Sequence, residues 1–237
     1  MPKNDDSRQR ASSAGKRRQK IASANSIIDA ALAVADRDGM HGVTIRAVAK
    51  AAGISPMALY TYFTHKQDLY DAMFASVIER AFERVGHPTW QLELEAGCKQ
   101  ARALLCAHPE WLPLLTRVAV PAASLPFYEH LLELTSADGI SPNDTMLATS
   151  SAISFTLGSV LVERMMTRAD DTAVPVAQLR LIKDRVRSTA VAKWPRIAST
   201  AAIFDGWSFD AVFEHGVRSL VAGIEQRARE KKAVQTA

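Results

Sequence analysis

Apolar residues recur at helical spacing along most of the chain from Ile21 onward. In the stretch SANSIIDAALAVADRDG, residues 23–39, this spacing puts Ile27, Ile28 and Leu32 on one face, and Gly39 ends the pattern. No stretch shows the strict alternation of a half-buried strand. We therefore predict an all-α fold, with helices over residues 23–39, 45–52, 56–63, 66–86, 89–106, 109–118, 124–137, 142–167, 175–192 and 209–229.

Glycine and proline divide this series of helices into regions. Gly86 and Pro88 follow the fourth predicted helix and favour a domain boundary there. The predicted organisation is a disordered basic arm (1–20), a three-helix N-terminal domain (21–86), a larger helical-bundle domain (87–230) and a flexible tail (231–237).

The stretch TIRAVAKAAGISPMALYTYFTHK, residues 44–66, has the pattern of a helix-turn-helix. Ala49 is small where a second helix would cross, and Gly53 suits a turn that needs a positive φ. Thr44 is expected to cap the first helix, and Ser55 and Pro56 are typical of the start of the second. The core positions are expected to be Val48, Ala52, Ile54, Leu59 and Phe63, which leaves Met57, Ala58, Tyr60, Thr61 and Tyr62 facing outward.

The segment GVTIRAVAKAAGISPMALYTYFTHKQDLYDAMF resembles the DNA-binding domain of the TetR (tetracycline repressor) family. The resemblance implies a phosphate contact for Thr44, a base or phosphate contact for Arg46, and backbone contacts for Tyr60 and Lys66. It also implies that several side chains face the major groove: Ser55, Met57, Ala58, Thr61 and Tyr62. The alternatives are amphipathic core tyrosines, above all at Tyr62, and ordinary solvated charges at Arg46 and Lys66.

The net charge of +4 is concentrated at the N-terminus, because residues 1–20 carry seven basic and two acidic groups, a net +5, and the remainder carries −1. Residues 21–86 contain six basic and seven acidic groups, so this domain has little electrostatic attraction for DNA of its own. The arm is therefore a candidate for phosphate binding, the alternative being a solubilising tail.

The remainder of the chain is similar to the effector-binding domain of the tetracycline-repressor type, through AHPEWLPLL, FTLGSVLVE and FEHGVRSLVAGIE. The resemblance implies a homodimer, with small residues such as Ser154, Gly158 and Ser159 at the helix contacts. It also implies a small-molecule pocket, for which the wider candidate set includes Trp90, Leu94 and Leu105. The preferred lining residues are Trp111, Leu115, Phe127, Leu131, Phe155, Val162 and Met166. For each of these, plain core packing is the alternative and the commoner fate of a helical apolar stripe.

Tetracycline repressors hold a drug–magnesium chelate with a histidine and a glutamate, whereas Leu115 and Val162 stand at the matching positions of this chain. Glu163 is the next residue, about 100° further round the helix. The effector is therefore expected to be a different small molecule, with no metal site and no cofactor.

The sequence lacks the motifs of other functional classes. There is no phosphate-binding loop, dinucleotide fingerprint, nucleophile elbow or cluster of histidines and cysteines, so an enzyme is not expected and no catalytic residue is assigned. Cys98 and Cys106 are expected to be free, buried thiols. No apolar run reaches the bilayer-spanning length of about 20 residues, and the N-terminus does not resemble a signal sequence, so a cytoplasmic protein without a membrane partner is expected.

The function predicted from these features is that of a transcriptional repressor that binds a palindromic operator in double-stranded DNA and is released by a small-molecule effector. The alternatives are a ligand-activated activator and a DNA-architectural protein without an effector.

Overall fold

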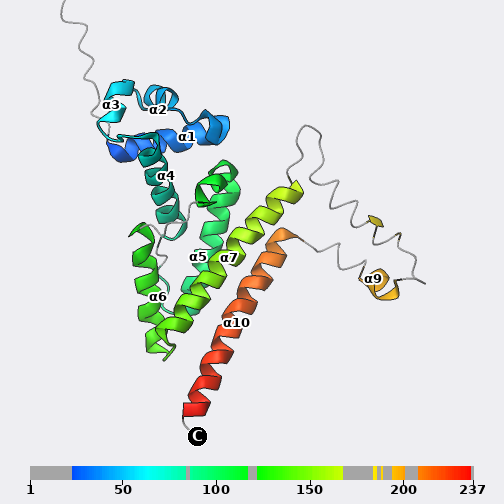
Figure 1. Ribbon diagram of the computed structural model, residues 1–237. Helices are drawn as coiled ribbons and strands as arrows, with labels where there is room; N and C mark the ends of the chain where they lie inside the picture. The colour runs from blue at the N-terminus through cyan, green and yellow to red at the C-terminus, as the bar shows by residue number, and fades with distance from the viewer. Residues whose placement is uncertain are drawn as a thin grey trace, which may run out of the picture. The chain divides into compact units, whose positions relative to one another are not determined.

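The computed structural model describes residues 23–83, 86–116, 122–167, 184–185, 188, 194–200 and 208–235, and every regular element in these ranges is helical. The all-α prediction is confirmed (Figure 1). The elements are α1 (Ala24–Gly42), α2 (Ile45–Ala52), α3 (Pro56–Tyr60), α4 (Lys66–Ala81), α5 (Trp90–Ala107), η1 (Pro109–Thr116), η2 (Ala122–Ser124), α6 (Leu125–Ala137), α7 (Pro142–Thr167), α9 (Pro195–Ser199) and α10 (Phe209–Gln235).

The chain forms two compact units, Met1–Leu69 and Tyr70–Ala237, with the division inside α4. The boundary between residues 86 and 87 was placed from glycine and proline alone, and it stays a prediction about domains. Each unit has its own apolar core.

In the first unit, α1 begins with a reciprocal cap in which Ser23 and Ser26 exchange side-chain to backbone hydrogen bonds. Its apolar stripe, which includes Ile27 and Leu32, is buried. The backbone at Gly39 has φ 69° and ψ 174°, which breaks the helical path where the sequence predicts the end. One further turn continues to Gly42 beyond this kink.

In the second unit, α7 packs against α5, α6 and α10, and Figure 1 shows α7 and α10 running side by side. The core cluster joins residues from all four helices and one from the connection between α6 and α7: Trp90, Leu94, Cys98, Phe127, Leu131, Ile140, Ala152, Phe213, Val217, Val221 and Ile224. Hydrogen bonds fix the ends of the helices around it. The Trp90 indole N–H donates to Asp138 at 2.9 Å, and the Thr135 and Thr145 hydroxyls lie 2.8 Å apart.

Several predicted ends differ from the observed ones. α3 ends at Tyr60 rather than Phe63, and α4 ends at Ala81 rather than near Gly86. The stretch from Pro109 forms a 3-10 helix that contains Pro113. Proline has no N–H to donate to the hydrogen-bond ladder of either kind of helix. α10 continues to Gln235, so part of the predicted flexible tail is helical.

Some expectations fall on residues that are not described. The basic arm 1–20 lies outside the described residues, and so does most of the helix predicted over 175–192. The expectation that both cysteines are buried is wrong for Cys106: both thiols are free, but only Cys98 is buried.

α7 contradicts the expectation that no segment is long and apolar enough to cross a bilayer. Pro142–Met166 passes that test by length and composition, with a hydropathy of 1.5 and only 33% of the window buried in the unit. One such helix is weak evidence for a membrane span. Threonine hydroxyls lower the polarity of the helix because they bond back to its own carbonyls, as Thr149 does to Thr145 and Thr156 to Ala152, both at 2.8 Å.

Candidate DNA interface and effector pocket

The turn between α2 and α3 is built around a left-handed glycine. Gly53 has φ 69° and ψ 27°, a conformation that costs a residue with a Cβ about 1–2 kcal/mol. Its N–H donates to the carbonyl of Lys50 at 3.3 Å, and the N–H of Ile54 donates to that of Ala49 at 3.0 Å. These bonds satisfy the last carbonyls of α2 while the chain turns into α3.

Side-chain caps start both helices of the pair, as the sequence predicts. The Thr44 hydroxyl accepts from the N–H of Ala47 at 3.2 Å, and the Ser55 hydroxyl accepts from the N–H of Ala58 at 3.1 Å. Pro56 takes the first position of α3, where the missing N–H leaves no bond unmade.

The buried side of the pair follows the predicted pattern with two exceptions. Val48, Ala49 and Leu59 are fully buried and Phe63 is 7% exposed. Ala52 and Ile54 are only half-buried. These residues fix the orientation of α3 on α2 and thereby decide which of its side chains face solvent.

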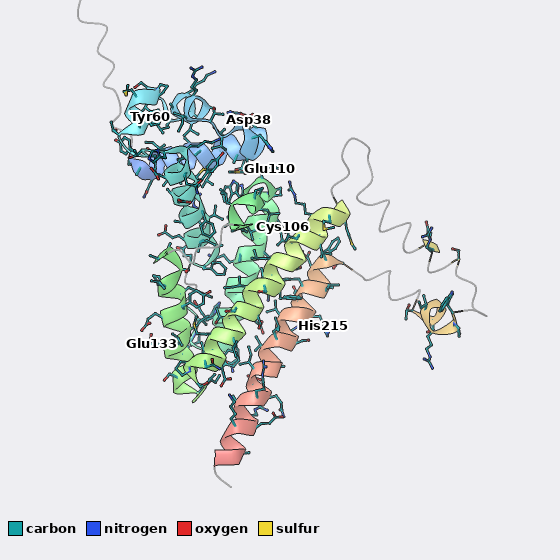
Figure 2. All side chains as sticks on the ribbon, in the orientation of Figure 1. Asp38, Tyr60, Cys106, Glu110, Glu133 and His215 are labelled. Atoms are coloured by element: carbon teal, nitrogen blue, oxygen red, sulfur yellow. The ribbon has the colours of Figure 1, made fainter. Side chains whose placement is uncertain are left out.

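The outward side of α3 forms what we call the recognition face: Ser55, Met57, Ala58, Tyr60, Thr61 and Tyr62. All of these side chains are exposed except that of Ala58, which is half-buried. The exposed fractions are 77% for Met57, 49% for Tyr60 and 41% for Tyr62. Figure 2 shows Tyr60 at the end of α3. Neither tyrosine is therefore a fully buried core residue, and their contacts with DNA stay a prediction.

Two cations lie on one exposed face of α2. Arg46 and Lys50 are four residues apart, and within the described part of the chain neither has an ion pair or a side-chain hydrogen bond. Lys50 was missed in the sequence analysis, where its i,i+4 spacing from Arg46 was the available signal. Thr44 and Lys66 are also exposed, and Lys66 has an interaction partner within the protein.

Within the described part of the chain, the residues predicted to line an effector pocket lie in several different environments, and their role as a lining stays a prediction. Phe127 and Leu131 belong to the core cluster, where Phe127 packs so tightly that a Cβ on Gly97 would lie 3.2 Å from its ring. Phe155 stacks on Phe213 with ring centroids 5.8 Å apart. Val162 and Met166 are 47% and 37% exposed.

Trp111 is the predicted pocket residue with an unmet polar group. It is 2% exposed and stacks on His108 at 3.9 Å, but its indole N–H has no hydrogen-bond partner. A buried donor of this kind costs free energy unless a partner is supplied. Leu115, four residues further on, is half-buried.

A pocket of about 360 Å³ lies at the C-terminal end of α5, where Figure 2 labels Cys106 and Glu110. Its lining comes from α5, η1 and α7: Leu105, Cys106, Pro109, Glu110, Val160, Glu163 and Arg164. Leu105, one of the wider candidates, is the residue of this lining that the sequence analysis named as a pocket candidate.

Ion pairs border this pocket. Arg164 pairs with Glu110 at 2.6 Å, and Arg102 pairs with Glu163 at 2.5 Å and with Asp210 at 2.6 Å. Arg102 therefore joins α5, α7 and α10, while its guanidinium lies 5.0 Å from the centre of the Phe213 ring. These pairs make the pocket wall polar on two sides and apolar at Leu105 and Val160.

The thiols differ in their surroundings. Burial raises the pKa of the Cys98 thiol, and partial burial together with the charge of Glu163 raises that of Cys106. Both are therefore protonated at neutral pH, and Cys106 is the one that a reagent can reach. The described residues contain no group of three or more His, Cys, Asp or Glu side chains that could hold a metal ion.

α7 has two opposite stripes. The buried one consists of Thr145, Thr149, Ala152, Thr156 and Val160. The other is exposed or half-buried, repeats at intervals of four and three, and combines large apolar side chains with small residues: Leu147, Ser151, Ser154, Gly158, Leu161 and Met165. This is the pattern of a helix with a second helical partner.

Comparison with known proteins finds family matches for both the N-terminal and the C-terminal region of the chain. Residues 27–73 match the profile of bacterial regulatory proteins of the tetR family, and residues 84–228 match the tetracyclin repressor-like C-terminal domain. Together these matches cover most of the chain, and the second alone covers more than half of it.

Individual relatives agree with the profiles. The chain is 26% identical over 205 residues to tetracycline repressor protein class D of Escherichia coli, a match that covers 84% of this chain and 88% of that one. It is 26% identical over 210 residues to the HTH-type transcriptional repressor DrrR1 of Streptomyces coeruleorubidus, covering 84% and 76%. Apo ActR from Streptomyces coelicolor shares the fold, with a TM-score of 0.72 at 19% identity over 88% of this chain and 97% of that one.

Proposed function

Because the chain belongs to the TetR family of bacterial regulatory proteins, whose members are DNA-binding transcription regulators and not enzymes, we propose that it is a cytoplasmic, homodimeric repressor released from a palindromic operator by a small molecule. The recognition face is the observation that carries the proposal. Its apolar and hydroxyl side chains are exposed on a helix whose orientation is fixed by Gly53 and by a buried core.

On the DNA side, α3 enters the major groove and the flanking cations contact phosphates. Arg46 and Lys50 are suited to this role because no acidic group neutralises them within the described part of the chain. On either side of the groove contact, Tyr60 and Thr44 offer hydroxyls to the DNA backbone. Lys66 adds a positive charge at the start of α4.

The basic arm supplies further phosphate affinity, because it carries a net +5 while residues 21–86 are nearly neutral. Deleting residues 1–20 is expected to weaken operator binding and to flatten the dependence of log K on log salt concentration. Arg46→Ala is expected to reduce the same slope by about one per subunit, whereas Lys99→Ala, at an exposed lysine of α5, leaves it unchanged. An unchanged slope in the deleted protein would refute the role of the arm.

Dimerisation uses the second stripe of α7 together with the exposed side of α10. The small residues permit close helix approach, and a Cβ added at Gly158 or Gly223 meets nothing within 4 Å in the single chain. A second copy would cover Leu161 and Met165, which are 48% and 76% exposed. The same contact accounts for the apolar surface that makes α7 resemble a membrane span, and it sets the spacing of two recognition helices.

The effector enters the second unit near the pocket between α5, η1 and α7. The wall offers ion-paired Glu110 and Arg164 beside apolar Leu105 and Val160, and the buried indole N–H of Trp111 belongs to the same short segment. A ligand that combines a ring system with hydrogen-bonding groups suits such a wall. A tetracycline–magnesium chelate does not, because Leu115 and Val162 stand where its ligands would be needed.

Selection of bound duplexes from a random pool tests the DNA half of the proposal. An inverted repeat is expected, together with a dimer in sedimentation analysis. Recovery of no enriched sequence at low salt, or of a monomer that binds a single site, contradicts the proposal.

Alkylation of Cys106 tests the effector half. At alkaline pH, which ionises more of the thiol, iodoacetamide is expected to modify Cys106 and to leave Cys98 unmodified in the folded protein, because only Cys106 is exposed. A compound found by thermal-shift screening to stabilise the protein is expected to slow the modification and to release the operator. A compound that releases DNA without protecting Cys106 would place the effector elsewhere.

A further inference from the structure

The recognition face lacks the side chains that read purines by paired hydrogen bonds. Guanine is usually read by arginine or lysine and adenine by asparagine or glutamine. None of these four residue types occurs from Ile54 to Phe63. Pro56 fills the first position of α3, so that position has neither a side-chain donor nor an N–H.

The hydroxyls at the two ends of α3 are partly committed within the protein. Thr61 donates its hydroxyl proton to the carbonyl of Ala58 at 2.7 Å, so it has no proton left for a base acceptor. Ser55 uses a lone pair of its hydroxyl to cap the N–H of Ala58. Apart from the hydroxyls of Tyr60 and Tyr62, which lie at and beyond the C-terminal end of α3, the helix therefore has little hydrogen-bonding capacity for base edges.

In place of hydrogen-bonding side chains, α3 presents the apolar side chain of Met57. It lies in the first turn of α3, the end of a recognition helix that contacts bases, and 77% of it is exposed. A flexible, polarizable thioether on the surface packs well against a methyl group. In the major groove, the methyl group on C5 of thymine is the apolar feature of the base pairs.

From these observations we infer that Met57, with Ala58 beside it, reads the 5-methyl groups of thymines in each half-site. The preference of α3 is then for thymine through apolar contact, and purine hydrogen bonding by its side chains contributes little. This inference rests on the proposed DNA-binding function and adds to it the chemistry by which bases are distinguished.

The test uses the tightest duplex recovered from a random selection, with its thymines replaced one by one by deoxyuridine. Uracil pairs as thymine does and lacks only the methyl group. Removing one buried methyl contact is expected to weaken binding about fourfold, and removing the symmetric pair about fifteenfold. Uracil placed outside the protected half-sites is expected to change nothing.

The protein side of the test is a double-mutant cycle. Met57→Ala is expected to bind the thymine duplex more weakly and to be nearly insensitive to the same replacement, whereas Met57→Leu retains most of the sensitivity. Leu92→Ala, at a 47% exposed leucine of α5, is the matched control and keeps wild-type sensitivity. Thermal unfolding checks that each variant is folded.

The outcomes separate the inference from the function on which it rests. A duplex that is bound specifically but tolerates every thymine-to-uracil replacement, or a Met57→Ala variant that remains as sensitive as the wild type, overturns the role of Met57. A selected half-site that lacks thymine also overturns it. If the selection enriches no sequence at all, the proposed function fails first.

Discussion

The α2–α3 pair and the bundle of α5, α6, α7 and α10 use the same apolar residue types in different ways. In the pair, Leu59 is fully buried and Met57, two positions earlier, is 77% exposed, so core and surface roles are separate. In the bundle, apolar side chains on one helix serve the core, a pocket wall and an exposed stripe, as on α7. The comparison shows that an apolar pattern indicates which side chains face solvent and can bind a partner only where few helices pack against the helix that carries it.

The largest expected effect tests this separation directly. Leu59→Ala removes a fully buried side chain and is expected to destabilise the first unit by about 2–5 kcal/mol, with loss of DNA binding through unfolding. Met57→Ala is expected to change stability by about 0.5 kcal/mol or less. Chemical denaturation followed by circular dichroism measures both. Equal losses of stability would show that the two roles are not separate.

A pair of glycines on α10 makes the corresponding test in the bundle. A Cβ on Gly216 would lie 2.1 Å from the ring of Phe155 in α7, so Gly216→Ala is expected to destabilise the second unit by about 1–3 kcal/mol. Gly223→Ala meets nothing within 4 Å and is expected to leave the single chain at least as stable, since alanine favours a helix.

Analytical ultracentrifugation then distinguishes packing within the chain from packing between copies. Gly223→Ala is expected to weaken the dimer without lowering the stability of the monomer. A dimer of unchanged affinity would remove Gly223 from the interface.

The sequence predicted the α2–α3 pair well because its signals are local. Thr44, Ser55, Pro56 and Gly53 each act within four residues, and the structure places all of them as predicted. Lys50 was missed because an exposed lysine gives no signal by itself; only its spacing from Arg46 and its lack of a partner distinguish it.

The bundle was predicted as a set of helices but not as a site. Val162 and Met166 belong to the same apolar run as buried Val160, and which face is covered depends on where α5 and α10 pack. Glu110, Glu163 and Arg164 were not assigned to a pocket because ion pairs between distant helices leave no pattern at short spacing. Tertiary packing, rather than periodicity, decides these positions.

Gly53 provides a smaller test in the pair. A Cβ there has open space around it, so the cost of Gly53→Ala is that of the left-handed backbone alone, about 1–2 kcal/mol. Gly53→Asn is expected to cost less, because asparagine adopts this conformation more readily. Thermal unfolding of both variants measures the difference. If the two were equally destabilised, the backbone conformation would not be the reason for glycine at this turn.

The smallest expected effect concerns the pH dependence of the bundle. The pKa of Asp144 lies below its ordinary value because its carboxylate accepts hydrogen bonds from Lys231, at 2.6 Å, and from Ser141, which connect the start of α7 to the end of α10. A lowered pKa in the folded state means that this contribution is present above the unfolded pKa, near 3.8, and is lost as the pH falls through the folded value.

Asp144→Asn is therefore expected to cost less than about 1 kcal/mol at pH 7, because Lys231 is 58% exposed and the pair is screened by solvent. The difference from the wild type shrinks below pH 4. Glu79→Gln, at an exposed carboxyl of α4 that has no partner within the described residues, is the control and shows no such trend. Urea denaturation at both pH values measures the difference. A penalty that persisted at low pH would mean that Asp144 contributes by helix capping through neutral hydrogen bonds, and that charge plays no part in joining these two helices.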